Sequence, residues 1–288
     1  MQHSRIVTIL LTLSAVAFAV SLVRPQTSNP LIDELKSPNA DVRARAAREL
    51  GKSADPSAVP ALATAVTDPS EKVRSEVIVA LSSIRVPESL DPLIVATRDT
   101  DSKVRALAVQ GLVGHYTGQT PSIGFAGFWK KTWRRTRDRF VEENIRIDPG
   151  VEVEPRVTSA LIETMNDVRA IEASRQAASA LGVLMAQAAV PDLVKAAYSS
   201  DKEVALEALN ALGKIKDLSA GPQLVNLLDS PTPEVKQEAA VTVGVLRTGE
   251  ALPKLQAMFE NNPDKRIRQK ALEGLAYLGN PVSVPLFT

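Results

Sequence analysis

Apolar residues recur along the chain with a period close to 31 residues. Each unit opens with a Leu that, in six of seven cases, has a Pro one or two residues before it, and a second apolar anchor follows eleven or twelve residues later. The leucines are Leu31, Leu62, Leu93, Leu161, Leu193, Leu224 and Leu255, and the second anchors are Val42, Val73, Val104, Ala173, Val204, Val235 and Ile267. The spacings of the second anchors are 31, 31, 69, 31, 31 and 32 residues, so a single insertion interrupts an otherwise regular repeat.

The pattern within each unit predicts two helices. Pro lies near the start of the first helix, where its missing N–H costs nothing. Side chains that cap helices lie three residues before the second anchor in six units: Asn39, Ser70, Asp101, Asp201, Thr232 and Asp264. After the anchor, apolar residues return at helical spacing, as in Val204, Ala208 and Leu212. The fourth unit has Ala170 at the capping position, so we expect its second helix to start earlier, capped by Asp167.

These helix pairs predict an all-α protein. One pair cannot bury its apolar face alone, but stacked pairs form one continuous core, which is the arrangement of an α-solenoid. We expect repeats 1–3 over residues 29–115, an insertion over 116–155, and repeats 4–7 over 156–288. The last range includes a short stub at 281–287 that resembles the opening turn of a further unit.

The strings DVRARAARELG (41–51), ADPSAVPALATAV (54–66) and EVALEALNALG (203–213) resemble HEAT-like repeats of the phycobilisome-lyase type. The resemblance implies an α-solenoid of seven HEAT-like two-helix repeats with one inter-repeat insertion, and protein binding or a lyase-like or chaperone-like role. It also implies that the second helices line a concave face. The polar positions chosen there as candidate partner-binding residues are Arg45, Arg48, Glu76, Gln110, Arg175, Glu207, Glu238 and Lys270.

The insertion is unusually aromatic. It holds six of the eleven Phe, Trp and Tyr residues, and between 125 and 140 the aromatic positions share one helical stripe opposite a basic face. We interpret this as an amphipathic helix that packs on the solenoid, lies on an anionic membrane surface, or docks a protein partner. Its candidate docking residues are Phe125, Phe128, Trp129, Lys130, Lys131, Trp133, Arg134 and Arg135. Residues 145–153 alternate around a turn and suggest a small hairpin.

Residues 1–28 have the pattern of a targeting segment. Arg5 precedes an uncharged apolar run from Ile6 to Val23, and small residues lie at the A-x-A spacing within it. This pattern predicts a secretory signal peptide, or a membrane anchor if it is not cleaved. Either outcome places the folded part outside the cytoplasm, in the periplasm, cell envelope or extracellular space.

Composition narrows the function further. The chain has 34 basic and 33 acidic residues, so its overall charge gives no reason to expect a nucleic-acid partner. It contains no Cys, which excludes disulfides and thiolate metal ligands. No HExxH, Walker, GxGxxG or GxSxG motif occurs, and His115 is expected to be an ordinary surface or edge residue. We therefore expect a non-catalytic protein-interaction scaffold or adaptor with no cofactor and no metal.

Overall fold

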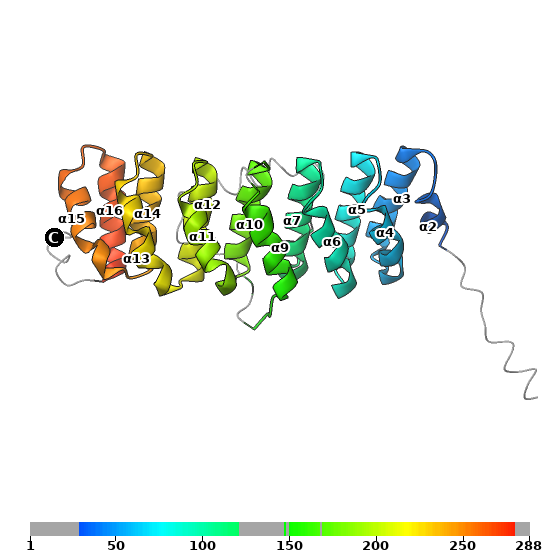
Figure 1. Ribbon diagram of the computed structural model, residues 1–288. Coiled ribbons are helices and arrows are strands. Elements are labelled where there is room, and N and C mark those ends of the chain that lie inside the picture. Colours follow the sequence, from blue (N-terminus) through cyan, green and yellow to red (C-terminus); the bar gives the residue numbers. More distant parts are fainter. Residues whose placement is uncertain (1–28, 121–146, 148–149, 168, 280–288) are drawn as a thin grey trace, which may run out of the picture.

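The computed structural model describes residues 29–120, 147, 150–167 and 169–279. Their helices are stacked side by side in chain order, so the two ends of the described chain lie at opposite ends of an elongated body (Figure 1). No strand occurs among the residues described, and seven consecutive helix pairs can be followed through them. The prediction of an all-α solenoid is confirmed.

The second helix of each pair is the longer one. These helices are α3 (Ala40–Ser53), α5 (Glu71–Ile84), α7 (Ser102–Thr117), α10 (Ile171–Val183), α12 (Lys202–Ile215), α14 (Pro233–Val245) and α16 (Lys265–Leu278). Each packs against the next along the stack, from α3 against α5 to α14 against α16. They form one layer of the solenoid, and we call its solvent-facing side the second-helix face.

The first helices form the other layer. They are α2 (Pro30–Glu34), α4 (Val59–Ala65), α6 (Leu90–Ala96), α9 (Pro155–Met165), α11 (Val190–Ala197), α13 (Gly221–Leu224) and α15 (Leu252–Asn261). Five of them follow a 3-10 turn that the sequence pattern did not predict: Pro56–Ala58, Pro87–Ser89, Gln187–Ala189, Leu218–Ala220 and Gly249–Ala251. After α13 the chain continues as the 3-10 segment Val225–Asp229. In two of the turns an Asp side chain accepts a backbone N–H, as Asp55 does from Ser57 at 2.9 Å.

The helix-capping predictions are correct for four of the second helices. The side chains of Asn39, Asp101, Asp201 and Asp264 each accept a hydrogen bond from a backbone N–H in the first turn. Ser70 and Thr232 occupy the capping position without such a bond.

The prediction for the fourth unit is wrong. Its second helix begins at Ile171 rather than earlier, and the capping position is Ala170. The Asp167 carboxylate is engaged in a tight turn instead, where it accepts the backbone N–H of Arg169 at 3.1 Å. Asp167 is therefore part of the preceding loop and caps no helix.

The core lies between the two layers and consists mostly of Leu, Val and Ala. Six of the seven repeat leucines are fully buried; Leu31, at the exposed N-terminal end, is only partly buried. Small residues let the second helices approach closely. A Cβ added to Gly182 on α10 would lie 2.7 Å from the Cα atom of Ala211 on α12. The alanines and glycines of the repeat thus set the distance between neighbouring units.

Arginines next to the second anchor join consecutive units. Arg43 donates through Nε to the Asp68 carboxylate of the next unit at 2.6 Å, and Arg74 donates to Asp99 at 2.7 Å. Nε and Nη2 of Arg74 both donate to the Asp99 carboxylate, and its remaining nitrogen, Nη1, donates to the carbonyl oxygen of Asp68 at 2.9 Å. Burial alone would raise the pKa of the Asp68 carboxyl, but the Arg43 guanidinium and the Ser70 N–H outweigh it and hold the pKa below its ordinary value. These partly buried pairs form a ladder along the first three units.

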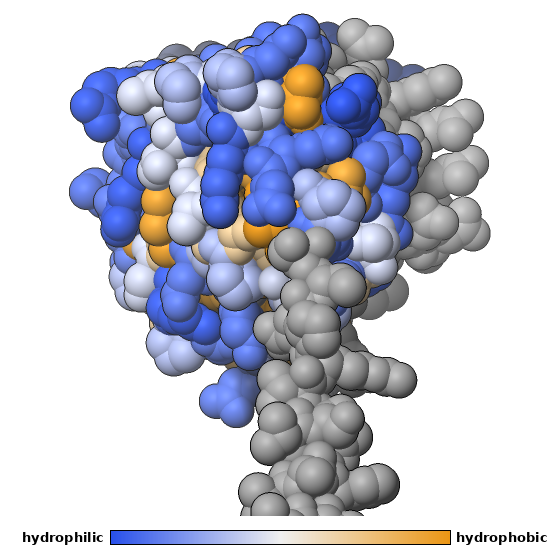
Figure 2. All heavy atoms as spheres, turned by 90° about the vertical axis from the view of Figure 1, so that its right-hand side faces the viewer, coloured by the Kyte–Doolittle hydropathy of each residue, from blue (hydrophilic) through white to orange (hydrophobic). Residues whose placement is uncertain are grey.

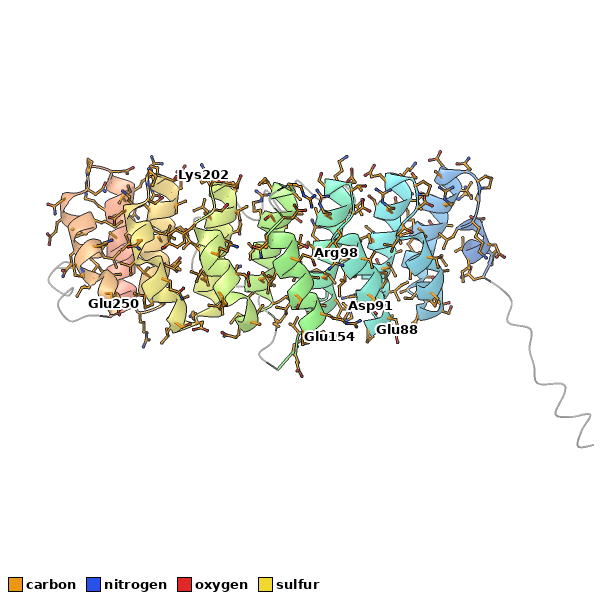
Figure 3. All side chains as sticks on the ribbon, viewed as in Figure 1. Glu88, Asp91, Arg98, Glu154, Lys202 and Glu250 are labelled. Atoms are coloured by element: carbon orange, nitrogen blue, oxygen red, sulfur yellow. The ribbon has the colours of Figure 1, made fainter. Side chains whose placement is uncertain are left out.

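Units three and four stack directly on each other although the insertion separates them in sequence. Arg98, two residues after the end of α6, donates to Glu163 on α9 at 2.9 Å. Arg156 on α9 pairs with both Asp91 on α6 and Glu154, and Asp91 and Glu154 lie near each other along the edge of the stack in Figure 3. The solenoid is therefore continuous across this junction.

Part of the insertion lies outside the described residues, including the predicted basic-aromatic helix over 125–140. The same is true of the predicted targeting segment 1–28 and of the stub 281–287. The suggested hairpin over 145–153 lies partly outside the described residues: of its range, only 147 and 150–153 are described, and no strand is assigned among them. Ile147 is buried and donates its N–H to the carbonyl oxygen of Val183 at 3.2 Å.

The N-terminal end of the stack has a mainly hydrophilic surface, with apolar residues in small separate areas (Figure 2). Helix α2 covers this end. Its C-terminal neighbour Leu35 is buried against the core, and Leu31 and Ile32 pack against it partly exposed. Short α2 thus closes the apolar interior of the first unit.

Candidate functional site

The eight predicted partner-binding residues lie on the seven second helices, one or two on each. Arg45 and Arg48 belong to α3, Glu76 to α5 and Gln110 to α7. The others follow in order along the stack, on α10, α12, α14 and α16: Arg175, Glu207, Glu238 and Lys270. Because each second helix packs against the next, the tertiary structure arranges these positions in a row along the layer.

The N-terminal part of this row is tied up in ion pairs. Arg48 pairs with Glu76 across α3 and α5, and the Glu76 carboxylate is buried beneath it. Arg45 lies 3.7 Å from Glu34, and 63% of its side chain is exposed. Arg45 is consequently available to a partner, whereas Glu76 acts mainly as the counter-charge of Arg48.

The centre of the row is hollowed. A hollow of about 430 Å³, counting space open to solvent, lies where α7, α10 and α12 meet. Its polar lining consists of Gln110, Arg175, Gln176, Ser179 and Glu207. Its apolar lining consists of Val109, Val113, Ala180 and Val183. The structure therefore brings three of the predicted residues, Gln110, Arg175 and Glu207, to one concave site.

Several polar atoms at this hollow are buried without a hydrogen-bond partner. They are Oε1 of Gln110, Oγ of Ser179 and Oε2 of Glu207. The amide nitrogen of Gln110 is engaged, since it donates to Gln176 at 3.3 Å. A buried polar atom without a partner costs roughly 1–3 kcal/mol, so a group that hydrogen-bonds to these three atoms would bind favourably at the hollow.

Glu207 has the most perturbed chemistry of the row. Burial raises the pKa of its carboxyl to about 7, and the neighbouring carboxylates Glu238 and Glu203 act in the same direction. Lys214 and Arg175 oppose this rise but do not cancel it. The Arg175 guanidinium donates to Glu172 at 2.6 Å, so its own charge is already balanced. Glu207 is thus poised to change its charge near neutral pH.

The C-terminal part of the row continues with mixed charge. Glu238 on α14 is close enough to Glu207 to influence its ionisation, and Lys270 on α16 pairs with Glu273 at 2.7 Å. Acidic and basic side chains are mixed along the row, with Arg45 and Arg48 at its N-terminal end and Glu207 and Glu238 on consecutive second helices. A partner with its own mixture of charges suits such a surface.

The sequence pattern did not identify the walls of the hollow. Val113, Ser179, Ala180 and Val183 lie one or two helical turns beyond Gln110 and Gln176, and their apolar or small side chains were indistinguishable from core positions. Residues three or four positions after a polar residue lie beside it on the same side of the helix, as Val113 does after Gln110 and Ser179 and Ala180 do after Gln176. This spacing could have identified the walls from the sequence.

His115, expected from the sequence to be a surface or edge residue, is half-buried near the C-terminal end of α7. Its ring packs edge-on against the Tyr116 ring with centroids 5.0 Å apart, and burial lowers the pKa of the imidazole. Across the residues the structure describes, no cluster of three or more His, Cys, Asp or Glu side chains could hold a metal ion. No helix in the same part of the chain is long and apolar enough to span a bilayer.

Several solved structures resemble the chain in fold. YibA of Escherichia coli is 17% identical with a TM-score of 0.53, and the match covers 90% of this chain and 84% of that one. Human deoxyhypusine hydroxylase is 21% identical over 86% and 83% of the two chains, with a TM-score of 0.40. The CpcE–CpcF complex of phycocyanin lyase from Nostoc sp. PCC7120 is 20% identical over 88% of this chain and 89% of that one, with a TM-score of 0.44. At 17% identity, the match to YibA shows the fold alone.

A family profile gives the firmer assignment. Comparison with curated protein sequences gave no match. The profile for HEAT repeats, in contrast, matches residues 28–113, 156–240 and 221–288, which together include most of the chain. These ranges coincide with the stacked helix pairs on both sides of the insertion. The chain therefore belongs to the HEAT-repeat family.

Proposed function

We propose that this protein is a non-catalytic scaffold that binds one or more protein partners along the second-helix face. The observation that carries the proposal is the hollow between α7, α10 and α12 with its unpartnered buried polar atoms, in the middle of a row of mixed charges. A solenoid presents such an extended surface because each unit contacts only its neighbours and leaves one side of every second helix free.

The test removes three positive charges from the row on the second-helix face. The control removes three positive charges from lysines outside the row. One variant carries Arg45→Ala, Arg175→Ala and Lys270→Ala. The control carries Lys72→Ala, Lys202→Ala and Lys254→Ala, which removes the same charge from side chains that pair with acids away from the row. Lys202 lies at one edge of the stack in Figure 3.

Partners are captured from cell-envelope extracts with the wild-type protein, identified, and measured as purified proteins. We expect the face variant to bind at least about tenfold more weakly and the control to bind like the wild type, since a lost charged contact costs about 1.5–3 kcal/mol. Equal affinity of all three proteins would rule out the second-helix face as the binding surface.

The proposal includes an exported location, which rests on the apolar run and A-x-A spacing of residues 1–28. Cell fractionation tests it: we expect the protein outside the cytoplasm. Full-length protein recovered from the cytosol would contradict export, while recovery with integral membrane proteins would favour an uncleaved anchor.

A lyase-like role would require a site for a small molecule, and the hollow is the place to look for it. Its polar groups are one carboxyl, two amides, one hydroxyl and one paired guanidinium. We interpret these groups as ones that bind a partner, because their buried atoms without hydrogen-bond partners can bond to complementary groups of another molecule. The scaffold function is therefore the one we propose.

A further inference from the structure

The hollow on the second-helix face has the chemistry of a receptor for one particular kind of side chain. We propose that it binds the side chain of a lysine or arginine from a partner protein, with its alkyl stem against the valines and its cationic head on Glu207. This inference rests on the proposed scaffold function and specifies what the scaffold recognises.

The hydrogen-bonding groups of the hollow call for a donor. Oε1 of Gln110 can only accept, and Oε2 of the ionised Glu207 can only accept; both are buried without a partner. Oγ of Ser179, also unpartnered, can accept a third bond. An ammonium group offers three donors and a guanidinium offers five, with no acceptor to be satisfied in return.

The charges around Glu207 favour a cation over an anion. Glu238 on α14 and Glu203 on α12 act on Glu207 as like charges, while Lys214 on α12 and Arg175 on α10 oppose them. Arg175 is balanced by Glu172, whose two oxygens lie 2.6 and 2.7 Å from it. Oε2 of Glu207 is buried without a hydrogen-bonded counter-ion among the described residues. A cation from a partner would supply it.

The apolar walls select the rest of the ligand. Val109 and Val113 from α7 face the hollow together with Ala180 and Val183 from α10. Aliphatic walls suit a chain of methylene groups, and lysine and arginine combine such a stem with a charged head. A compact cation such as a metal ion would leave these walls unused.

The first experiment uses small analogues of the two side chains. The full-length chain is labelled with ¹⁵N and titrated with n-butylammonium, with n-butylguanidinium, and with n-pentanol as a neutral probe of similar length. Amide shifts of Ser179, Ala180 and Val183 report binding at the hollow. We expect both cations to saturate these shifts, with n-pentanol at least about tenfold weaker.

Two variants and a change of pH make the result specific. Glu207→Gln should abolish the preference for cations over n-pentanol, whereas Glu250→Gln, at an exposed position labelled in Figure 3, should preserve it. Because the pKa of Glu207 is about 7, cation affinity in the wild type should rise about tenfold between pH 6 and pH 8. Circular dichroism of Glu207→Gln checks that the variant is folded.

The proposal is overturned if the cations leave these three amides unshifted, if n-pentanol binds as tightly, or if Glu207→Gln keeps the preference. The fate of the scaffold function is decided separately. Loss of partner binding in the Arg45, Arg175 and Lys270 variant, together with no cation binding, would remove the lysine or arginine receptor and leave the scaffold standing. Partner binding that is indifferent to every change on the face would remove the scaffold itself.

Discussion

At the scale of single residues, the buried Arg–Asp pairs between units carry more stability than the exposed ion pairs. Arg74 and Asp99 are about nine-tenths buried and hydrogen-bonded through two nitrogens. Arg74→Ala leaves the Asp99 carboxylate without its partner, so we expect a loss of about 3 kcal/mol of unfolding free energy. Urea denaturation followed by circular dichroism measures it.

The matched control breaks an exposed pair of the same type. Arg98 and Glu163 are 62% and 57% exposed, so Arg98→Ala should cost less than about 1 kcal/mol. Similar losses from both substitutions would show that burial does not distinguish these pairs.

Glu207 should make the free energy of unfolding fall as the pH rises, whereas a carboxylate that is ion-paired at the surface makes it rise. The pKa of Glu207 is raised to about 7 in the folded protein from its ordinary value of 4.5, so between these values the folded state holds a proton that the unfolded state releases. The contribution of Glu207 to the free energy of unfolding is therefore largest below about pH 4.5. It falls by roughly 2–3 kcal/mol as the pH rises through about 7.

Glu207→Gln removes this titration. Between pH 5 and pH 8 the free energy of unfolding should fall less in the variant than in the wild type, by roughly 2–3 kcal/mol. Urea denaturation at both pH values measures the two falls. Glu250→Gln serves as the control and should keep the wild-type difference. An unchanged difference in Glu207→Gln would mean that the carboxyl is ionised in the folded protein throughout this range.

At the scale of helices, the spacing between second helices depends on which glycines face a neighbour. A Cβ on Gly182 would lie 2.7 Å from the Cα atom of Ala211, whereas a Cβ on Gly213 would have no atom within 4 Å. Gly182→Ala should therefore force α10 and α12 apart and cost about 1–3 kcal/mol. Gly213→Ala should be neutral or stabilise the protein by up to about 1 kcal/mol, because Ala favours the helix.

Thermal unfolding of the two variants tests this contrast directly, since the substitutions are chemically identical and both lie in second helices. A lower midpoint for Gly213→Ala than for Gly182→Ala would contradict the packing described for α10 and α12.

At the scale of the whole molecule, the solenoid should not need residues 121–146 in order to fold. Units three and four contact each other directly through Arg98 and Glu163, Gln110 and Gln176, and the Tyr116 hydroxyl, which accepts the Glu154 N–H at 3.2 Å. Replacing 121–146 with a Gly/Ser segment of equal length should change the melting midpoint by only a few degrees. Calorimetry measures it, and a large fall would show that the aromatic stripe belongs to the core.

The same replacement and the Trp129→Ala, Trp133→Ala double variant separate the other two interpretations of the insertion. Co-sedimentation with anionic and neutral vesicles tests a membrane surface, where the basic face and the aromatic stripe act together. Binding of the wild type to anionic vesicles that both variants lose and that salt weakens would support it. Loss of a purified protein partner without vesicle binding would support docking instead.

The sequence by itself determined the architecture. Regular spacing of leucines, small residues and capping side chains is local information, and a solenoid is built from local contacts between neighbouring units, so periodicity predicts the fold. The row from Arg45 to Lys270 came from the resemblance to HEAT-like repeats, which implied that the second helices line the concave face, and helical periodicity then gave the polar positions on those helices.

Only the tertiary structure decided what the row can do. Burial of Glu207 depends on the packing of three helices around it, and the hollow with Ser179 and Val183 arises where α7 meets α10 although 53 residues separate Thr117 from Ile171 in the chain. The start of α10 at Ile171, where an earlier start capped by Asp167 was expected, likewise followed from a turn whose hydrogen bonds the pattern did not reveal. Periodicity assigns each residue to a side of its helix, but solvation and hydrogen-bond partners depend on the exact distances between helices, and these follow from side-chain packing in three dimensions.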